Sequence, residues 1–369
     1  MQEQELIPLP ERNPETKPNF AILTPFEFAA DFSKEAAYAL RQGSMIKEDK
    51  RPKVWLQSMQ VESGHGPEIL YWNLQKAGEL GFDARLHLDA YSRYVSLGSP
   101  NYIPVFGKDR PAFREVNKKQ LEHLRQSGVN VIYTNPHKSL EKIMYMKGRS
   151  HKKMAVVSSE DRQVAWIGGM NMWDTGFFKM DYMVKITDPG IVAAIIDEFP
   201  RINENRRTED AAIQCTPDTA LLIDCGKRGE SIILDKTMQQ VEGAKQKIIC
   251  ISELEPEGEF LQVLTQAYKR HVEITFITNS PSKEGFELKA NRIVKKLTFR
   301  YKNPEFPLTY PKVDLHAKLL IVDDQIIIVG SNNFSPTTAK YGTEEAALIS
   351  TNPTLVGNAE AFVSKILQN

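Results

Sequence analysis

The stretch Asp314-Leu-His-Ala-Lys-Leu-Leu-Ile-Val-Asp323 places a histidine and a lysine at the head of an apolar run. Residues 319–322 of this run are typical of a buried β-strand. Side chains at positions i and i+2 of a strand point to the same face, so His316 and Lys318 are expected to project together. The stretch therefore predicts a strand that carries both groups at its start.

The same pattern occurs 165 positions earlier (316 − 151), where His151 and Lys153 precede the apolar residues 154–157. Each copy is followed by small residues and an asparagine, namely Gly168, Gly169 and Asn171 in the first and Gly330, Ser331 and Asn333 in the second. One copy alone would be equally consistent with an ordinary surface strand. Two aligned copies indicate one active site assembled from two halves of the chain.

The sequence around the motifs is duplicated as well, because each half runs strand, helix, strand. These segments are 53–58, 66–80 and 84–89 in the first half, and 247–252, 257–270 and 272–279 in the second. A hairpin partner follows each motif strand, at 164–167 and 326–329. Strand-helix-strand units of this length imply right-handed crossovers and a mostly parallel sheet. We therefore expect an α/β fold of two similar units, flanked by helices and related by a pseudo-twofold axis.

Domain boundaries follow from the composition along the 369 residues. Residues 1–25 are rich in Pro, Glu and Asn and are expected to form an extended arm. Residues 26–205 and 206–369 are the two predicted units, with the polar stretch 203–218 as the linker between them.

The bulk composition, 41% hydrophobic and 25% charged, is ordinary for a soluble globular protein. A formal net charge of zero disfavours a nucleic-acid substrate, because phosphate backbones are bound by cationic surfaces. Cys215, Cys225 and Cys250 show no metal-ligand spacing with histidine. No signal peptide or transmembrane stretch is evident, so we expect a monomer that is cytoplasmic or bound peripherally to a membrane.

The paired motifs suit chemistry on a phosphodiester. Lys153 and Lys318 can stabilise the negative charge that spreads over the phosphate oxygens, and Asn171 and Asn333 can add amide donors. Histidine titrates near pH 6.5, so one ring can be a neutral nucleophile while the other is a protonated acid. A covalent phosphohistidine would divide one displacement into two easier ones, and the mechanism requires neither metal nor cofactor.

A nucleophilic imidazole needs an acceptor that orients its other ring nitrogen. The candidates are Asp181, 30 positions after His151, and Glu344 and Glu345, 28 and 29 positions after His316.

This constellation resembles the phospholipase D superfamily, whose signature is His-x-Lys, four residues, Asp, and then Gly-Gly/Ser-x-Asn. The second motif matches throughout and includes Asp323. In the first motif Ser158 stands where the aspartate is expected. Asp161 lies seven positions before Gly168, as Asp323 lies before Gly330, so Asp161 is a candidate for a displaced equivalent behind a short insertion. The resemblance implies that this aspartate is largely structural.

The resemblance covers roughly residues 50–369 and is strongest to the bacterial cardiolipin synthase and phosphatidyltransferase branch. It implies a ping-pong hydrolase or phosphatidyl transferase that acts on phospholipids at a membrane surface. It also implies His151 as the nucleophile and His316 as the acid. Two alternatives remain open at this point: a metal-independent nuclease with the same site, and an inactive lipid-binding homologue whose first motif has lost its aspartate.

Overall fold

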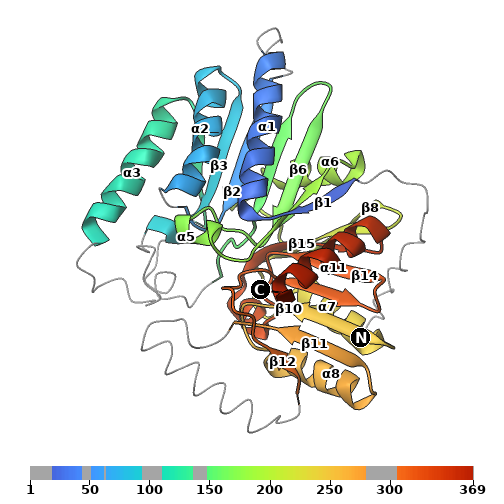
Figure 1. Cartoon of the computed structure of the whole chain (residues 1–369). Coiled ribbons are helices and arrows are strands. Elements are labelled where there is room, and N and C mark those ends of the chain that lie inside the picture. Colours follow the sequence, from blue (N-terminus) through green and yellow to red (C-terminus); the bar gives the residue numbers. More distant parts are fainter. Residues whose placement is uncertain are drawn as a thin grey trace.

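The computed structural model describes residues 19–43, 51–61, 64–93, 110–135, 148–279 and 306–368. Each half of the chain contributes one β-sheet, of seven strands in the first half and eight in the second. Helices flank both sheets (Figure 1). The predicted α/β class with two similar units is therefore confirmed.

The first sheet has the strand order β1-β7-β6-β5-β2-β3-β4. Its strands are β1 (Phe20–Leu23), β2 (Lys53–Ser58), β3 (Asp83–Asp89), β4 (Asn130–Thr134), β5 (Met154–Ser158), β6 (Gln163–Gly168) and β7 (Met183–Ile186). The helices of this half are α1 (Pro25–Gly43), α2 (His65–Glu79), α3 (Arg110–Gln126), α5 (Asp174–Phe177) and α6 (Pro189–Glu198).

The second sheet has the order β12-β11-β10-β13-β14-β15-β9-β8. Its strands are β8 (Ala211–Thr216), β9 (Thr219–Cys225), β10 (Lys247–Ile251), β11 (Glu273–Ile277), β12 (Leu308–Thr309), β13 (Leu319–Val322), β14 (Ile326–Gly330) and β15 (Glu344–Ser350). The helices are α7 (Ile232–Gly243), α8 (Gly258–Lys269), α10 (Pro336–Tyr341) and α11 (Pro353–Gln368). Read from its other end, this order matches the first sheet strand by strand, with β8 as an additional edge strand.

The expectation of mostly parallel sheets is wrong, because both sheets are mixed. In each half three neighbouring strands run parallel, β2-β3-β4 and β10-β11-β12. The motif strands and those beyond them pair antiparallel. A helical crossover produces parallel neighbours, as α2 does between β2 and β3 and α8 between β10 and β11. The tight turns that join β5 to β6 and β13 to β14 allow antiparallel pairing alone.

Two segments that the sequence did not predict as strands form strands. Residues 20–23, within the expected arm, form β1 and pair with β7. Residues 211–216, within the expected linker, form β8 and pair with β9. β8 lies at the sheet edge with no fully buried residue, so its sequence lacks the apolar run that identifies an inner strand.

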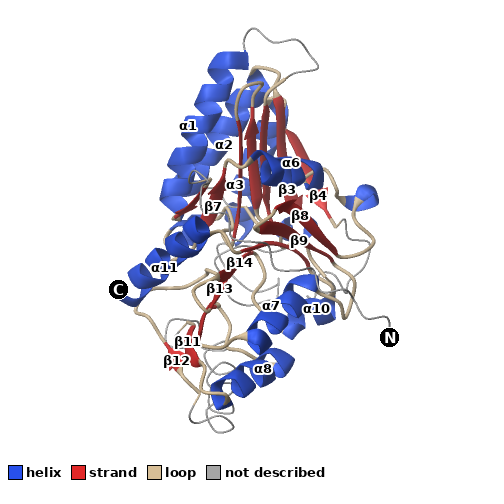
Figure 2. Cartoon of the chain, turned by 90° about the vertical axis from the view of Figure 1, so that its right-hand side faces the viewer, coloured by secondary structure: helices blue, strands red, loops and turns tan. Residues whose placement is uncertain are grey.

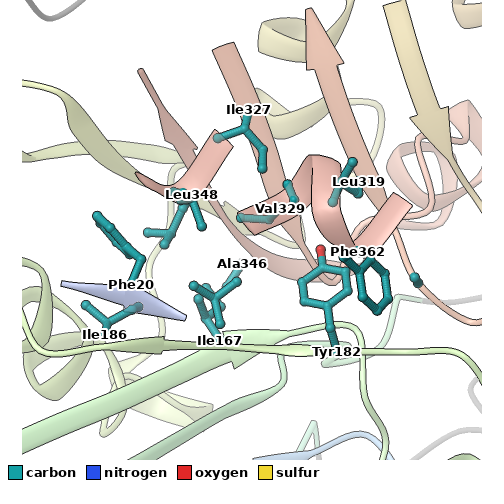
Figure 3. Packing of buried hydrophobic residues seen from close by; sticks show 14 of the residues in the cluster. Phe20, Ile167, Tyr182, Ile186, Leu319, Ile327, Val329, Ala346, Leu348 and Phe362 are labelled. Carbon is teal, nitrogen blue, oxygen red and sulfur yellow. The ribbon is translucent and has the colours of Figure 1, made fainter. Parts of the chain in front are cut away.

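The two sheets share one hydrophobic core between their inner faces (Figure 3). Its members come from both halves, with Phe20, Ile167, Tyr182 and Ile186 from the first and Leu319, Ile327, Val329, Ala346, Leu348 and Phe362 from the second. The helices between the sheets each contact the sheet of the opposite half. α6 of the first half contacts β8 and β9, and α11 of the second half contacts β1. This shared core fixes the halves against each other and positions the motif strands β5 and β13.

The outer faces are covered separately. α1, α2 and α3 pack on the outer face of the first sheet, and α7 and α8 on that of the second (Figure 2). No helix in the described ranges is long and apolar enough to cross a membrane.

Candidate active site

The two motif histidines lie at the boundary between the halves, because each is held by the backbone of the opposite half. The His151 N–H donates to the Glu344 carbonyl at 2.8 Å. In the equivalent arrangement the His316 N–H donates to the Met180 carbonyl at 3.0 Å. Glu344 begins β15 and Met180 precedes β7, so equivalent segments of the two halves exchange these contacts.

Each imidazole is oriented by a carboxylate from the opposite half. His151 Nδ1 lies 3.0 Å from both carboxylate oxygens of Glu345. His316 Nδ1 lies 2.6 Å from Asp181 Oδ2. When Nδ1 donates its proton to the carboxylate, Nε2 of a neutral ring keeps its lone pair and can attack phosphorus or accept a proton. Asp181 and Glu345 were both candidates from the sequence, but the crossing between the halves was not foreseen.

Two fully buried lysines accompany the histidines. Lys153 and Lys318 each donate from Nζ to the backbone carbonyl of their own motif histidine, at 2.7 Å for Lys153. Burial lowers the pKa of both ammonium groups, to about 7 for Lys153. Glu345 opposes this shift of the pKa at Lys153, and Asp181 opposes it at Lys318. A bound anion would therefore stabilise the protonated form of both lysines.

Burial also lowers the pKa of both motif histidines, and for His316 well below its usual range. Both rings are then neutral near pH 7 in the free protein, whereas the sequence allowed for one protonated ring. When both lysines are protonated, the two ammonium groups and the two orienting carboxylates balance in charge. A bound anion would add one negative charge to this centre and would favour protonation of one imidazole.

The motif asparagines lie beside equivalent serines at the ends of β2 and β10. Asn171 is buried and accepts from the Ser58 hydroxyl at 3.5 Å, while its Nδ2 has no hydrogen-bond partner among the described residues. The Ser252 hydroxyl donates to the backbone carbonyl of Asn333 at 3.0 Å. The Nδ2 group of Asn171 is thus a donor available to a phosphate oxygen.

Gly169 of the first motif allows the halves to approach closely. A Cβ atom at this position would lie 2.5 Å from Asp181 Oδ1 and 3.3 Å from Lys318 Cδ. A side chain would therefore push apart the carboxylate and the lysine that flank His316.

Asp323 does not join the histidines, which corrects its prediction as a catalytic residue. It lies in the turn between β13 and β14 and accepts backbone N–H bonds from Lys245, Gln246 and Lys247 at 2.9, 2.8 and 2.9 Å. The motif strand separates the turn from the site by seven positions (323 − 316), or about 20 Å of extended chain. Asp323 therefore anchors the hairpin to the start of β10.

Asp161 occupies the equivalent hairpin turn but has other partners. It accepts from the Tyr38 hydroxyl at 2.6 Å and from the Ser159 hydroxyl at 2.9 Å. Asp161 therefore ties its turn to α1 rather than to a neighbouring strand, and it does not reach the histidines.

The remaining supporting candidates, Ser331 and Glu344, do not contact a motif histidine through their side chains. The Ser331 hydroxyl donates to Glu345, the carboxylate that orients His151. Glu344 contributes its backbone carbonyl, while burial raises the pKa of its side chain, which does not contact a motif histidine.

Two positioning residues were not identified from the sequence. Asp89 Oδ2 accepts the N–H of Ser150, which precedes His151, at 2.6 Å. Asn279 makes two hydrogen bonds to the backbone of Leu315, which precedes His316. Its Nδ2 donates to the Leu315 carbonyl and its Oδ1 accepts from the Leu315 N–H, each at 2.7 Å. Asp89 and Asn279 are equivalent because each lies six positions after the paired starts of β3 and β11 (89 − 83 and 279 − 273). A polar residue at the same position relative to two duplicated strands was the sequence signal that could have identified them.

A third carboxylate faces the second histidine. Glu253 Oε2 lies 3.6 Å from His316 Nε2, and Glu253 Oε1 lies 4.0 Å from Lys179 Nζ. The Trp173 ring stands edge-on to His316, with 5.9 Å between ring centroids. The sequence offered no pattern that would distinguish Glu253 from an ordinary loop acid.

The described part of the chain contains no group of three or more His, Cys, Asp or Glu side chains that could hold a metal ion.

Known proteins share both sequence and fold with this chain. Cardiolipin synthase B of Salmonella typhimurium is 25% identical over 321 residues, which cover 80% of this chain and 70% of the relative. The Escherichia coli K12 enzyme of the same name is 24% identical over 325 residues, with the same coverage. Phosphatidylserine synthase of Haemophilus influenzae has a similar fold, with a TM-score of 0.66 over 99% of this chain and 90% of that chain at 14% identity.

The sequence model of one family, described as "Cardiolipin synthase, PLD-like domain", matches residues 46–203 and 237–367. These two segments contain the two His-x-Lys motifs, one in each, and together make up well over half of the chain. The resemblance to phospholipase D enzymes is thereby confirmed. This chain belongs to the cardiolipin synthase, phospholipase D-like domain family.

Proposed function

We propose that this protein transfers phosphatidyl groups between alcohols on phospholipids through a phosphohistidine. The observation that carries the proposal is the crossed arrangement at the centre, in which each buried imidazole is oriented by a carboxylate of the opposite half. Such an arrangement supplies two basic Nε2 atoms beside two cations, which is what a two-step displacement at phosphorus requires. The similarity to cardiolipin synthase B and phosphatidylserine synthase supports transfer to an alcohol rather than hydrolysis.

In the first step His151 Nε2 attacks phosphorus and the bond from phosphorus to the leaving alcohol breaks. His316 gives its Nε2 proton to that alcohol oxygen. Lys153 and Lys318 stabilise the charge on the non-bridging oxygens, and Glu345 stabilises the positive charge that develops on His151.

In the second step the acceptor alcohol occupies the place of the departed alcohol. His316 Nε2 removes its proton, its oxygen bonds to phosphorus, and the bond from phosphorus to His151 breaks. Both histidines end in their starting protonation states, so the cycle closes without another reactant.

We further propose that the protein docks on the bilayer through a patch of exposed apolar side chains beside the site. The patch comprises Phe26 and Phe178, which are 48% and 72% exposed. The rings of Phe26 and Phe178 lie 5.8 Å apart. Phe178 is five positions beyond Trp173, whose ring contacts His316. A bilayer in contact with this patch would therefore present its phospholipids next to the catalytic centre.

The central test is a parallel incubation with labelled phosphatidylglycerol, phosphatidylcholine and single-stranded DNA, followed by an acid quench or a base quench. We expect label on the protein from a phospholipid, stable to base and labile to acid, as a phosphoramidate is. The His151→Ala variant should acquire no label, because it lacks the nucleophile.

The outcomes separate the alternatives that the sequence left open. Labelling or cleavage with DNA alone would replace the lipid function by a nuclease function. Full turnover by either His151→Ala or His316→Ala would refute the shared centre, and no label with any substrate would point to an inactive homologue.

A further inference from the structure

We infer that Glu253 forms a subsite for the acceptor alcohol and selects neutral polyols by binding a second hydroxyl group. This inference rests on the proposed phosphatidyl transfer. It adds a residue that recognises the acceptor.

The first argument is the position of Glu253 relative to the reacting atoms. Its Oε2 atom lies 3.6 Å from His316 Nε2, the atom that exchanges a proton with the leaving and the attacking alcohol. An oxygen bound to His316 Nε2 therefore brings its own neighbouring atoms within hydrogen-bond reach of this carboxylate. The side chain is 21% exposed, so the carboxylate can be reached by an entering molecule.

The second argument is that the pseudo-twofold symmetry breaks at this position. β2 and β10 are equivalent from Lys53 and Lys247 onward, so Glu253 corresponds to Met59, six positions after each start (253 − 247 and 59 − 53). Met59 is buried and cannot bind a hydroxyl group through a charge. The site is therefore acidic on the His316 side, where alcohols enter and leave, and apolar at the matching place beside the nucleophile.

The third argument is that a cation already faces the carboxylate. Lys179 Nζ lies 4.0 Å from Glu253 Oε1 and 5.7 Å from the centre of the Trp173 ring. An acceptor with an ammonium group would meet this like charge, whereas a hydroxyl group would not. Glu253 is thus matched to a neutral donor group.

In the second step the two hydroxyl groups of the acceptor have different roles. One hydroxyl of the polyol passes its proton to His316 Nε2, and its oxygen bonds to phosphorus as the bond from phosphorus to His151 breaks. A second hydroxyl donates a hydrogen bond to Glu253 and remains unchanged. Glu253 exchanges no proton and acts as a specificity-determining residue.

The test compares acceptors that differ in the second hydroxyl. Vesicles of phosphatidylglycerol and phosphatidylcholine in equal parts are incubated with radiolabelled glycerol, 1-propanol or ethanolamine, and label in the lipid fraction is measured. Loss of one hydrogen bond to a charged group corresponds to a change on the order of tenfold. Glu253→Ala should therefore lower the ratio of glycerol to 1-propanol incorporation about tenfold. Glu253→Gln, which keeps an acceptor oxygen, should give an intermediate ratio.

The matched control is Glu255→Gln, an acid of the same loop that accepts from the Tyr310 hydroxyl at 3.1 Å instead of facing His316. This variant should keep the wild-type acceptor ratio. An unchanged ratio in Glu253→Ala would overturn the inference. An equal loss of glycerol and 1-propanol incorporation would also overturn it, because Glu253 would then act through His316. Equal use of ethanolamine and glycerol by the wild type would overturn it as well. No incorporation of any alcohol, together with no labelled histidine, would overturn the proposed function itself.

Discussion

Replacing Asp323 should destabilise the protein without changing its chemistry. The carboxylate accepts three backbone N–H bonds, of which two are solvent-exposed and one is half-buried. Each such bond contributes about 0.5–1.5 kcal/mol net, and water can replace the exposed ones, so Asp323→Ala should cost about 2 kcal/mol. Asp323 has a φ of 53°, where Ala is disfavoured by about 1 kcal/mol more. Asp323→Asn tolerates this φ and keeps one acceptor oxygen, so it should cost about 1 kcal/mol.

Urea denaturation of the wild type and both variants measures these differences, and pH provides an internal check. Burial alone would raise the pKa of Asp323, but the backbone N–H groups of Lys247, Lys245 and Gln246 outweigh it and lower the pKa. Because the folded pKa lies below the unfolded value of about 3.9, the stabilisation is present above about pH 4 and is lost as the pH falls through the folded pKa. The gap between the wild type and Asp323→Asn should therefore close in acid.

The control for this prediction is Asp161→Asn in the equivalent turn, whose carboxylate accepts from the Tyr38 and Ser159 hydroxyl groups instead of three backbone N–H groups, so the change should cost less than Asp323→Asn. All of these variants should keep wild-type kcat when folded. An Asp323→Asn protein as stable as the wild type would refute the anchoring role, and a fully folded but inactive one would restore Asp323 to the catalytic set.

Four further outcomes follow from the geometry. Glu345→Gln should lower kcat by about 100-fold or more while the fold is kept, because His151 loses both its orienting contact and its counter-charge; single-turnover labelling measures it. Since Lys153 has a pKa of about 7 in the free protein, kcat/KM should fall as the pH rises above about 7, and a profile flat to pH 9 would contradict this. Gly169→Ala should reduce kcat more than stability, because its Cβ would lie 2.5 Å from Asp181 Oδ1, as paired denaturation and rate measurements would show. Phe178→Ser should weaken sedimentation with phosphatidylglycerol vesicles several-fold while turnover of short-chain lipid in solution is kept.

The residues gathered at the candidate site could be predicted because their spacing is local. A His-x-Lys pair directly ahead of a strand indicates in the sequence which side chains share a face, and a repeat shows that there are two such pairs. The partners of the histidines were predictable as residue types but not as pairs. Asp181 follows His151 along the chain and yet orients His316, a crossing that depends on how the two sheets pack. No local pattern records that packing.

The strand directions show a similar limit. Two neighbouring strands of each sheet, β2 with β3 and β10 with β11, were correctly expected to run parallel, because a helix connects them. The third parallel strands, β4 and β12, were not predicted. The rest of each sheet pairs antiparallel and includes β1 and β8. β1 is apolar but only four residues long, and β8 has no fully buried residue, so neither stands out as a strand in the sequence. Their place is decided by contact with the opposite half, as when Phe20 of β1 enters the shared core.

The duplicated fold explains which parts of the site are alike and which differ. A phosphodiester has two non-bridging oxygens that are chemically equivalent, and the lysines and the orienting carboxylates that serve the phosphate occur as matched pairs. Its two alcohols are not equivalent, since one remains on phosphorus and the other exchanges. A site with perfect twofold symmetry would bind this substrate equally well in both directions, and half of the binding events would present the wrong alcohol to the acid. In the proposed mechanism, Glu253 at the position equivalent to Met59 removes that ambiguity beside His316. This difference between the halves lies where the substrate itself is asymmetric, which is the pattern expected if direction of transfer is set by the acceptor side of the site.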